Sequence, residues 1–222
     1  MVAGAVLSCC GSGTAPVALH PATSTSSTTI TTTTTIPPTT TTTTDPGLLP
    51  QTATEPPVDA SLQATLAPLW TAIVSDSVDP ALTVFFPQSA YLQMKTGVLP
   101  GPASDYADRL IAFYRLDIAA YHQALGPAAS TAKLLSVDAS AADAAYIPPG
   151  ACENKIGYWH LPGARFVYQV GGSVESFGVA SLISWRGEWY VVHLGPNPRS
   201  QNIGTVDQPA VGPGVVGPPG GC

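Results

Sequence analysis

The stretch that decides the fold runs from Leu182 to Leu194 and reads LISWRGEWYVVHL. Two runs rich in β-branched and aromatic residues flank the dipeptide Arg186-Gly187. Such a pattern is typical of two antiparallel strands joined by a tight turn. It is the most specific structural signal in the chain, so the other elements are predicted outward from it.

The residues before this hairpin also follow the period of two that strands show. Glycine pairs mark tight turns between such runs, and Gly178 is expected to mark a bulge inside the longest of them. The expected strands and turns are, in order, a strand over 133–137, a strand over 157–161, a turn at Pro162-Gly163, a strand over 165–170, a turn at Gly171-Gly172, and strands over 173–185 and 188–194.

Helical periodicity precedes the strands. Apolar residues recur at helical spacing over 62–74 and over 110–125. Residues 81–95 are interpreted as one or two short helical pieces around Pro87. Ser104 is expected to cap the last and longest helix, and Gly126-Pro127 to end it. Helices followed by a run of antiparallel strands predict an α+β fold, with N-terminal helices packed on one face of a curved antiparallel sheet.

Composition divides the chain of 222 residues into four parts. Residues 59–198 carry the amphipathic pattern and are enough for one domain with a sizeable core. Residues 11–58 are rich in Thr and Pro and are predicted to form a disordered, semi-stiff linker, of the kind that is often O-glycosylated. Residues 199–222 are rich in Gly and Pro and are predicted to form a flexible tail.

The first ten residues, MVAGAVLSCC, are interpreted as the end of a signal peptide that runs into a lipobox. Bacterial lipoproteins are acylated on the cysteine that follows such a tripeptide, so Cys9 is predicted to carry a lipid. This predicts an exported protein anchored at the extracellular face of the cell membrane. The apolar run is short and no basic residue precedes it, so we expect the true start upstream of Met1. The other interpretation is an ordinary apolar N-terminus with two chance cysteines.

Four cysteines allow three pairings, and the sequence does not choose between them. If Cys9 carries lipid, Cys152 and Cys222 are the natural pair. Their disulfide would close a loop of about 70 residues, worth roughly 4 kcal/mol in the chain-entropy description. The alternative is that Cys222 stays free or pairs between chains.

Charge and motifs exclude several classes of function. The formal net charge is −6 and the eight Lys and Arg residues are scattered, which argues against nucleic acid and anionic membrane surfaces as partners. No apolar run reaches the length of a transmembrane helix. No Cys/His spacing predicts a metal site, and no phosphate-binding or dinucleotide motif predicts a cofactor.

Four segments stand out between residues 62 and 194, namely Trp70-Thr71-Ala72-Ile73-Val74, Phe85-Phe86-Pro87 with Tyr91, Lys155-Ile156-Gly157-Tyr158 and Ser181–Leu194. Through these segments the chain resembles a family of exported actinobacterial proteins of uncharacterised function. The order of elements is also similar to the NTF2-like (cystatin-like) α+β cone, in which a bent sheet wraps a long helix and often leaves a pocket. The second likeness is architectural and implies no activity.

Three residues are candidates for acid/base chemistry in such a pocket. Asp117 and Tyr114 lie on the buried side of the longest helix, and His193 ends the last strand. Strand alternation predicts that His193 faces the same side as Trp189 and Val191. The alternative roles are structural: a hydrogen-bonded histidine, and a carboxylate that is solvated or paired with Arg115 or another neighbour.

Three further residues are candidates for ligand binding, namely Tyr158, Trp185 and Arg186. Aromatic side chains near a cation could floor a glycan site, whereas core packing and solvation are the alternatives. The sequence therefore predicts a membrane-anchored binding or accessory module without enzymatic activity, whose partner is an envelope protein, a glycan or a small hydrophobic ligand. The alternatives are an isomerase-like or cyclase-like enzyme that uses a cone pocket, and a structural wall-associated protein.

Overall fold

The computed structural model describes residues 44–199 and 201–218. The predicted lipidation site Cys9, the predicted disulfide partner Cys222 and most of the predicted linker lie outside these ranges. The described residues form helices and an antiparallel sheet of six strands, which confirms the predicted α+β class.

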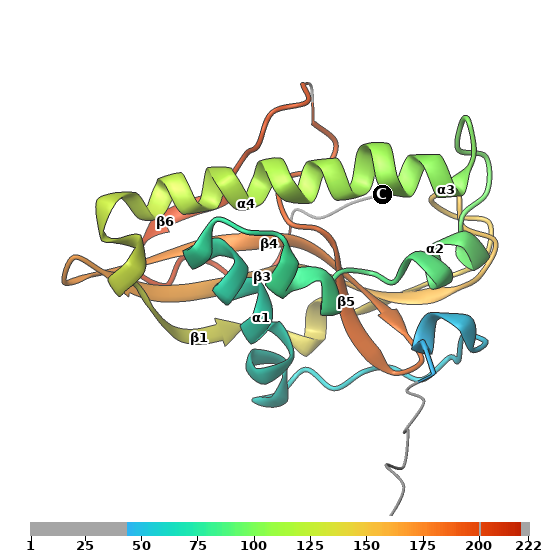
Figure 1. Ribbon diagram of the computed structural model, residues 1–222. Coiled ribbons are helices and arrows are strands. Elements are labelled where there is room, and N and C mark those ends of the chain that lie inside the picture. The colour runs from blue at the N-terminus through green and yellow to red at the C-terminus, as the bar shows by residue number, and fades with distance from the viewer. Residues whose placement is uncertain (1–43, 200, 219–222) are drawn as a thin grey trace, which may run out of the picture. The chain divides into compact units, whose positions relative to one another are not determined.

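The sheet is built on two long neighbouring strands, β3 and β4 (Figure 1). β1 and β2 pair with opposite ends of β3, whereas β5 and β6 pair with opposite ends of β4. All of these pairings are antiparallel. The strands are β1 Lys133–Asp138, β2 Ala145–Ile147, β3 Tyr158–Val170, β4 Ser173–Trp185, β5 Glu188–His193 and β6 Asp207–Val211.

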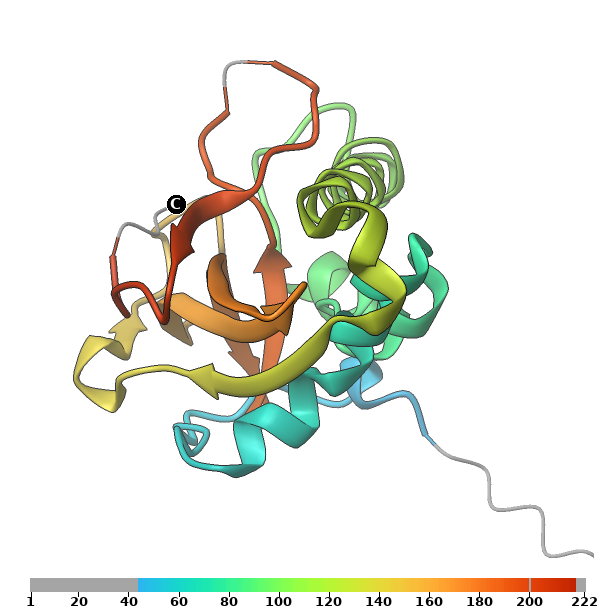
Figure 2. The same ribbon diagram turned by 90° about the vertical axis from the view of Figure 1, so that its left-hand side faces the viewer.

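The helices precede the sheet in the chain. α3, η3 and α4 follow one another without a break and form one long helix, which Figure 1 shows lying across the sheet and Figure 2 shows end-on beside it. The helical elements are η1 Pro46–Leu48, α1 Ser61–Ser75, η2 Asp79–Thr83, α2 Gln88–Met94, α3 Pro102–Asp105, η3 Tyr106–Leu110, α4 Ile111–Leu125, η4 Gly126–Thr131 and η5 Ala141–Asp143.

The helix predictions are confirmed except at one boundary. Pro68 lies inside α1 without ending it. The long helix starts at Pro102, directly after Gly101, so Ser104 lies inside the helix and does not cap it. Proline is favoured at the first helical position because its fixed φ suits the helix and no N–H is needed there.

The predicted turn at Pro162-Gly163 is wrong, because β3 runs through both residues as a single strand. Gly163 has a φ of +62° and a Cβ there would collide with the backbone of Gly217. The N–H of Gly217 donates to the Gly163 carbonyl at 3.0 Å. The glycine therefore serves a close approach between two chain segments and not a reversal of direction.

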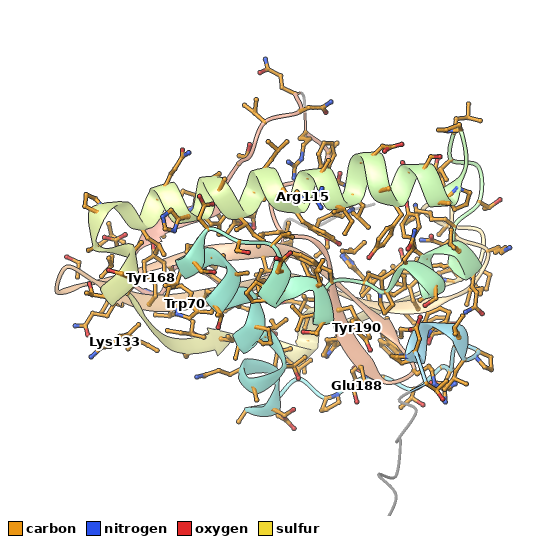
Figure 3. All side chains as sticks on the ribbon, in the orientation of Figure 1. Trp70, Arg115, Lys133, Tyr168, Glu188 and Tyr190 are labelled. Carbon is orange, nitrogen blue, oxygen red and sulfur yellow. The ribbon has the colours of Figure 1, made fainter. Side chains whose placement is uncertain are left out.

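The core between helix and sheet is aromatic. Trp70 of α1 lies against Phe166, Tyr168 and Phe177 of β3 and β4, with ring centroids 5.5 to 6.2 Å apart. Figure 3 labels Trp70 and Tyr168, which lie next to one another. Edge, tilted and stacked ring contacts of this kind add to the stabilisation that comes from burying the rings.

Three tryptophans hold the segment before α1, which the sequence assigns to the linker. The indole N–H groups of Trp159, Trp185 and Trp189 donate to backbone carbonyls of Ala53, Pro46 and Pro57, at 3.0 to 3.1 Å. An extended proline-rich chain has unpaired carbonyls, and a buried indole needs an acceptor. The ordered part therefore begins before residue 59.

The segment after β5, predicted to be a flexible tail, instead returns to the sheet as β6. Arg199 makes an ion pair with the buried Asp117 of α4, from Nη2 to Oδ2 at 2.7 Å. The same carboxylate accepts hydrogen bonds from the N–H groups of Gly195 at 3.0 Å and Thr205 at 3.2 Å. Contacts between residues this far apart in sequence leave no periodic pattern, so the sequence alone did not predict them.

Within the described ranges, no helix combines the length and the apolar character that a bilayer crossing requires.

Replacing Arg199 by Met should destabilise the domain by about 3–5 kcal/mol, because it leaves the buried Asp117 carboxylate without its cation. Urea unfolding measures the loss. Arg115→Met is the matched control. Arg115 lies exposed on α4, the helix that carries Asp117 (Figure 3), and no ion pair of the described residues includes it. Equal stability of the two variants would contradict the role assigned to Arg199.

Candidate functional site

A cavity of about 880 Å³ lies between the first turns of the long helix, the end of α2 and the sheet. Its volume falls in the range of small-molecule sites in proteins. Its lining comes from α2, from the loop after it, from α3 and η3, from β2 to β5 and from the segment that follows β5.

A bulge in β5 directs His193 into this cavity. Val191 pairs with Leu182, but His193 pairs with Ser181, so Val192 is an extra residue on the β5 side. Ser181 and Leu182 are neighbours on β4, so their side chains face opposite sides of the sheet. Their partners His193 and Val191 therefore also face opposite sides. The prediction that they share a face is therefore wrong, because simple alternation takes no account of the bulge.

The helix side of the cavity carries a charged network. Arg109 donates from Nε to Oδ1 of Asp105 at 2.6 Å and from Nη2 to Oδ2 at 2.7 Å. The hydroxyl of Tyr91 donates to the same carboxylate and accepts from Nη2 of Arg109 at 3.0 Å. Burial acts to raise the pKa of Asp105, but the hydrogen bonds from Arg109 and Tyr91 outweigh it and lower the pKa.

Lys95 lies at the end of α2, next to the loop that carries Cys152. Its Nζ donates to the Cys152 carbonyl at 2.9 Å and lies 3.7 Å from Oε2 of Glu153. Burial lowers the pKa of Lys95. Cys152 is disulfide-bonded, and since the other three cysteines all lie outside the described residues, so does its partner.

The sheet side of the cavity carries neutral polar groups. Nε2 of His160 lies 3.1 Å from Oγ of Ser181. Burial lowers the pKa of His160 and, together with the nearby cations, lowers the pKa of His193 to about 3. Both imidazoles are therefore uncharged at neutral pH and can donate or accept hydrogen bonds.

The rest of the wall is mostly apolar. Asn154 and Asn197 are polar exceptions. Asn154 is buried, and its Oδ1 accepts no hydrogen bond within the described part of the chain. A buried acceptor without a donor costs about 1–3 kcal/mol. The apolar lining residues are Met94, Val98, Leu99, Leu110, Ile147, Ile183 and Val192.

Of the three acid/base candidates, only His193 lines the cavity. Asp117 is fully buried outside the cavity. Its two carboxylate oxygens accept hydrogen bonds from the guanidinium of Arg199 and from backbone N–H groups. The hydroxyl of Tyr114 lies 2.8 Å from the Val191 carbonyl, and its ring stacks on Phe85 with centroids 3.6 Å apart. Both residues stabilise packing between helix and sheet.

Of the three ligand-binding candidates, only Tyr158 lines the cavity. Trp185 is fully buried, and its indole N–H donates a hydrogen bond to the Pro46 carbonyl. Arg186 has a φ of +55° in the β4–β5 turn, where its N–H donates to Oε1 of Gln51 at 2.6 Å. The three residues therefore do not form one site.

The charged residues of the cavity were not among the sequence candidates. Asp105 and Arg109 stand four residues apart, a spacing that places them on one face of a helix. That signal was present in the sequence, but it cannot distinguish a surface pair from one that lines a cavity. Lys95 and Tyr91 gave no signal, because only folding brings α2 to the start of the long helix.

Among the described residues, no group of three or more His, Cys, Asp or Glu side chains is arranged to hold a metal ion.

Comparison with protein-family models, with curated proteins and with solved structures finds no significant match for this chain. Its function is therefore argued from the cavity itself.

The low pKa of His193 should make the domain less stable in acid. The unfolded histidine titrates near pH 6.5 and the folded one near pH 3, so between these values the unfolded chain binds more protons. Stability then falls as the pH falls, by up to about 1.4 kcal/mol per pH unit.

Urea unfolding of wild type and His193→Gln, from about pH 7 down to about pH 4, measures this dependence. The variant should lose less stability over that interval. Both proteins keep Asp207, whose pKa burial raises to about 6, so its contribution cancels in the comparison. Parallel pH profiles would show that His193 does not have the low pKa.

Proposed function

We propose that this domain is a binding module, which holds a small amphipathic molecule in the cavity without transforming it. The observation that carries the proposal is the cavity itself. It is large enough for a small ligand, and aliphatic side chains line it together with polar groups that converge from different elements. This combination is typical of ligand-binding sites.

The hydrogen-bonding state of the lining supports a ligand that brings polar groups. No hydrogen bond of the described residues uses the ring nitrogens of His193, and Oδ1 of Asn154 accepts none. Polar groups at a cavity wall would be satisfied by a bound molecule or by water. Met94, Ile183 and the other apolar residues of the wall would bury the remainder of the ligand.

The cavity also supports the finer assignment of the fold, an NTF2-like cone. In that architecture a bent sheet and a long helix enclose a pocket, and here the long helix and β3 to β5 contribute to one cavity. We further propose that the chain belongs with the exported actinobacterial lipoproteins that its sequence resembles. Cys9 would then anchor it to the membrane, with the Thr-rich linker holding the domain away from the surface.

One observation favours a second function, an enzyme with acid/base groups in the cavity. His160 and Ser181 are in contact, and the neutral His193 is the backbone partner of Ser181. A neutral imidazole can accept a proton from a substrate. The cavity lacks Asp117 and Tyr114, the other two candidates, so binding remains the first proposal.

Filling the cavity with a larger side chain should weaken ligand binding. The wild-type domain is expected to increase the fluorescence of N-phenyl-1-naphthylamine in a saturable titration, and Val192→Phe should weaken that binding about tenfold or more, a loss of about 1.4 kcal/mol. Val174→Phe is the control, because Val174 lies on β4, is 39% exposed and does not line the cavity. If Val192→Phe titrates like wild type, the probe does not bind in this cavity.

The proposed anchor is tested by expressing the gene with its upstream region in an actinobacterial host and recording the mass of the mature N-terminus. We expect a chain that begins at Cys9 and carries acyl groups. Cys9→Ala should release the protein from the membrane fraction into the medium. A mature protein with an unmodified Cys9 would rule out the anchor.

A further inference from the structure

The charge around the cavity indicates what its occupant carries. Two basic residues line it, Lys95 and Arg109, and two acidic ones, Asp105 and Glu153. The acids are not equivalent. Asp105 is buried and bound by Arg109 through two hydrogen bonds, whereas the side chain of Glu153 is 62% exposed. Arg109 is therefore paired with a buried carboxylate, whereas Lys95 is paired with an exposed one.

Lys95 makes no direct ion pair with a buried carboxylate. Its side chain is only 17% exposed, and its only ion-pair partner among the described residues is the solvated Glu153 at 3.7 Å. The buried Asp105 acts on Lys95 without an ion-pair contact and is already bound by Arg109. The ammonium group can donate three hydrogen bonds, of which the Cys152 carbonyl accepts one. Keeping a cation away from water is costly unless an anion is close. An acidic group inside the cavity would remove that cost.

Arg109 offers a second donor to the same acidic group. Its Nε and Nη2 are used by Asp105 and Tyr91, but no hydrogen bond of the described residues uses Nη1. The contacts with Asp105 and Tyr91 hold the guanidinium in one orientation. Arginine is the side chain best suited to carboxylates, because its N–H groups form a rigid, planar fork.

We propose that the occupant of the cavity is an amphipathic carboxylate. Its acid group lies between Lys95 and Nη1 of Arg109, and its apolar body lies against Met94, Leu110 and Ile183. This inference rests on the proposed binding function and names the class of ligand.

The electrostatics at the opposite wall agree with it. Besides burial, the groups that lower the pKa of His193 most are Arg109, Arg199 and Lys95, all of which are cations. Three cations therefore act on the sheet side of the cavity, although the chain as a whole has a formal net charge of −6. Cations gathered at one site attract an anion to that site, whereas the net negative charge of the chain repels an anion from the rest of the surface.

Three probes with the same alkyl chain test the inference: dodecanoate, dodecanol and dodecylamine, each measured by its displacement of N-phenyl-1-naphthylamine at neutral pH. We expect wild type to bind dodecanoate at least tenfold more tightly than dodecanol, and dodecylamine most weakly. Lys95→Gln should reduce the affinity for dodecanoate about tenfold and leave that for dodecanol unchanged. Lys155→Gln is the matched control, because Lys155 lies exposed in the neighbouring loop and does not line the cavity.

The outcomes separate this inference from the proposed function. Equal binding of dodecanoate and dodecanol would overturn the carboxylate and leave the binding function standing. Failure of all three probes to bind would overturn both. The comparison of probes on wild type decides the matter even if Lys95→Gln does not fold.

Discussion

The carboxylate of Asp117 is the constraint on which the C-terminal half of the domain depends. It lies on α4 with no exposure to solvent, and it gathers Gly195, Arg199 and Thr205 from the chain that follows β5. These contacts anchor both ends of a loop whose continuation forms β6 against β4. A charge at this depth requires partners, and the chain supplies them from a segment without any hydrophobic pattern.

The same arrangement shapes the proposed binding site. Asn197 and Pro198, at the rim of the cavity, lie between two of the residues that Asp117 holds. On β5, the extra residue Val192 turns His193 toward the interior. The segment that carries Asn197 and Pro198 is thus held by a hydrogen-bonded cluster that is not itself part of the cavity.

The two walls of the cavity differ in their chemistry. The helix wall holds fixed charges, because Asp105, Arg109 and Tyr91 bind one another and leave little freedom of orientation. The sheet wall holds uncharged imidazoles and aliphatic side chains. A molecule with one acidic end and an apolar body would be complementary to both walls.

Local sequence patterns were sufficient to predict the class of the fold and most of its elements. The β4–β5 hairpin, the aromatic strands and the three amphipathic helices were all predictable, because their signals are local periodicities of side-chain polarity. Turn chemistry was informative where the turn was tight, as at Arg186-Gly187, and misleading at Pro162-Gly163, where the glycine serves a contact with Gly217.

Only the tertiary structure decided the site. Lys95, Asp105 and Arg109 meet His160 and His193 across more than one element, and the spacing of these residues in the chain contains no trace of that meeting. One inserted residue in β5 was enough to reverse the predicted direction of His193. Asp117 and Trp185 are residue types that often occur in functional sites. Here Asp117 is paired with Arg199, and the indole N–H of Trp185 donates to the Pro46 carbonyl. Local patterns determine which elements form, whereas long-range contacts determine which side chains remain available for a ligand.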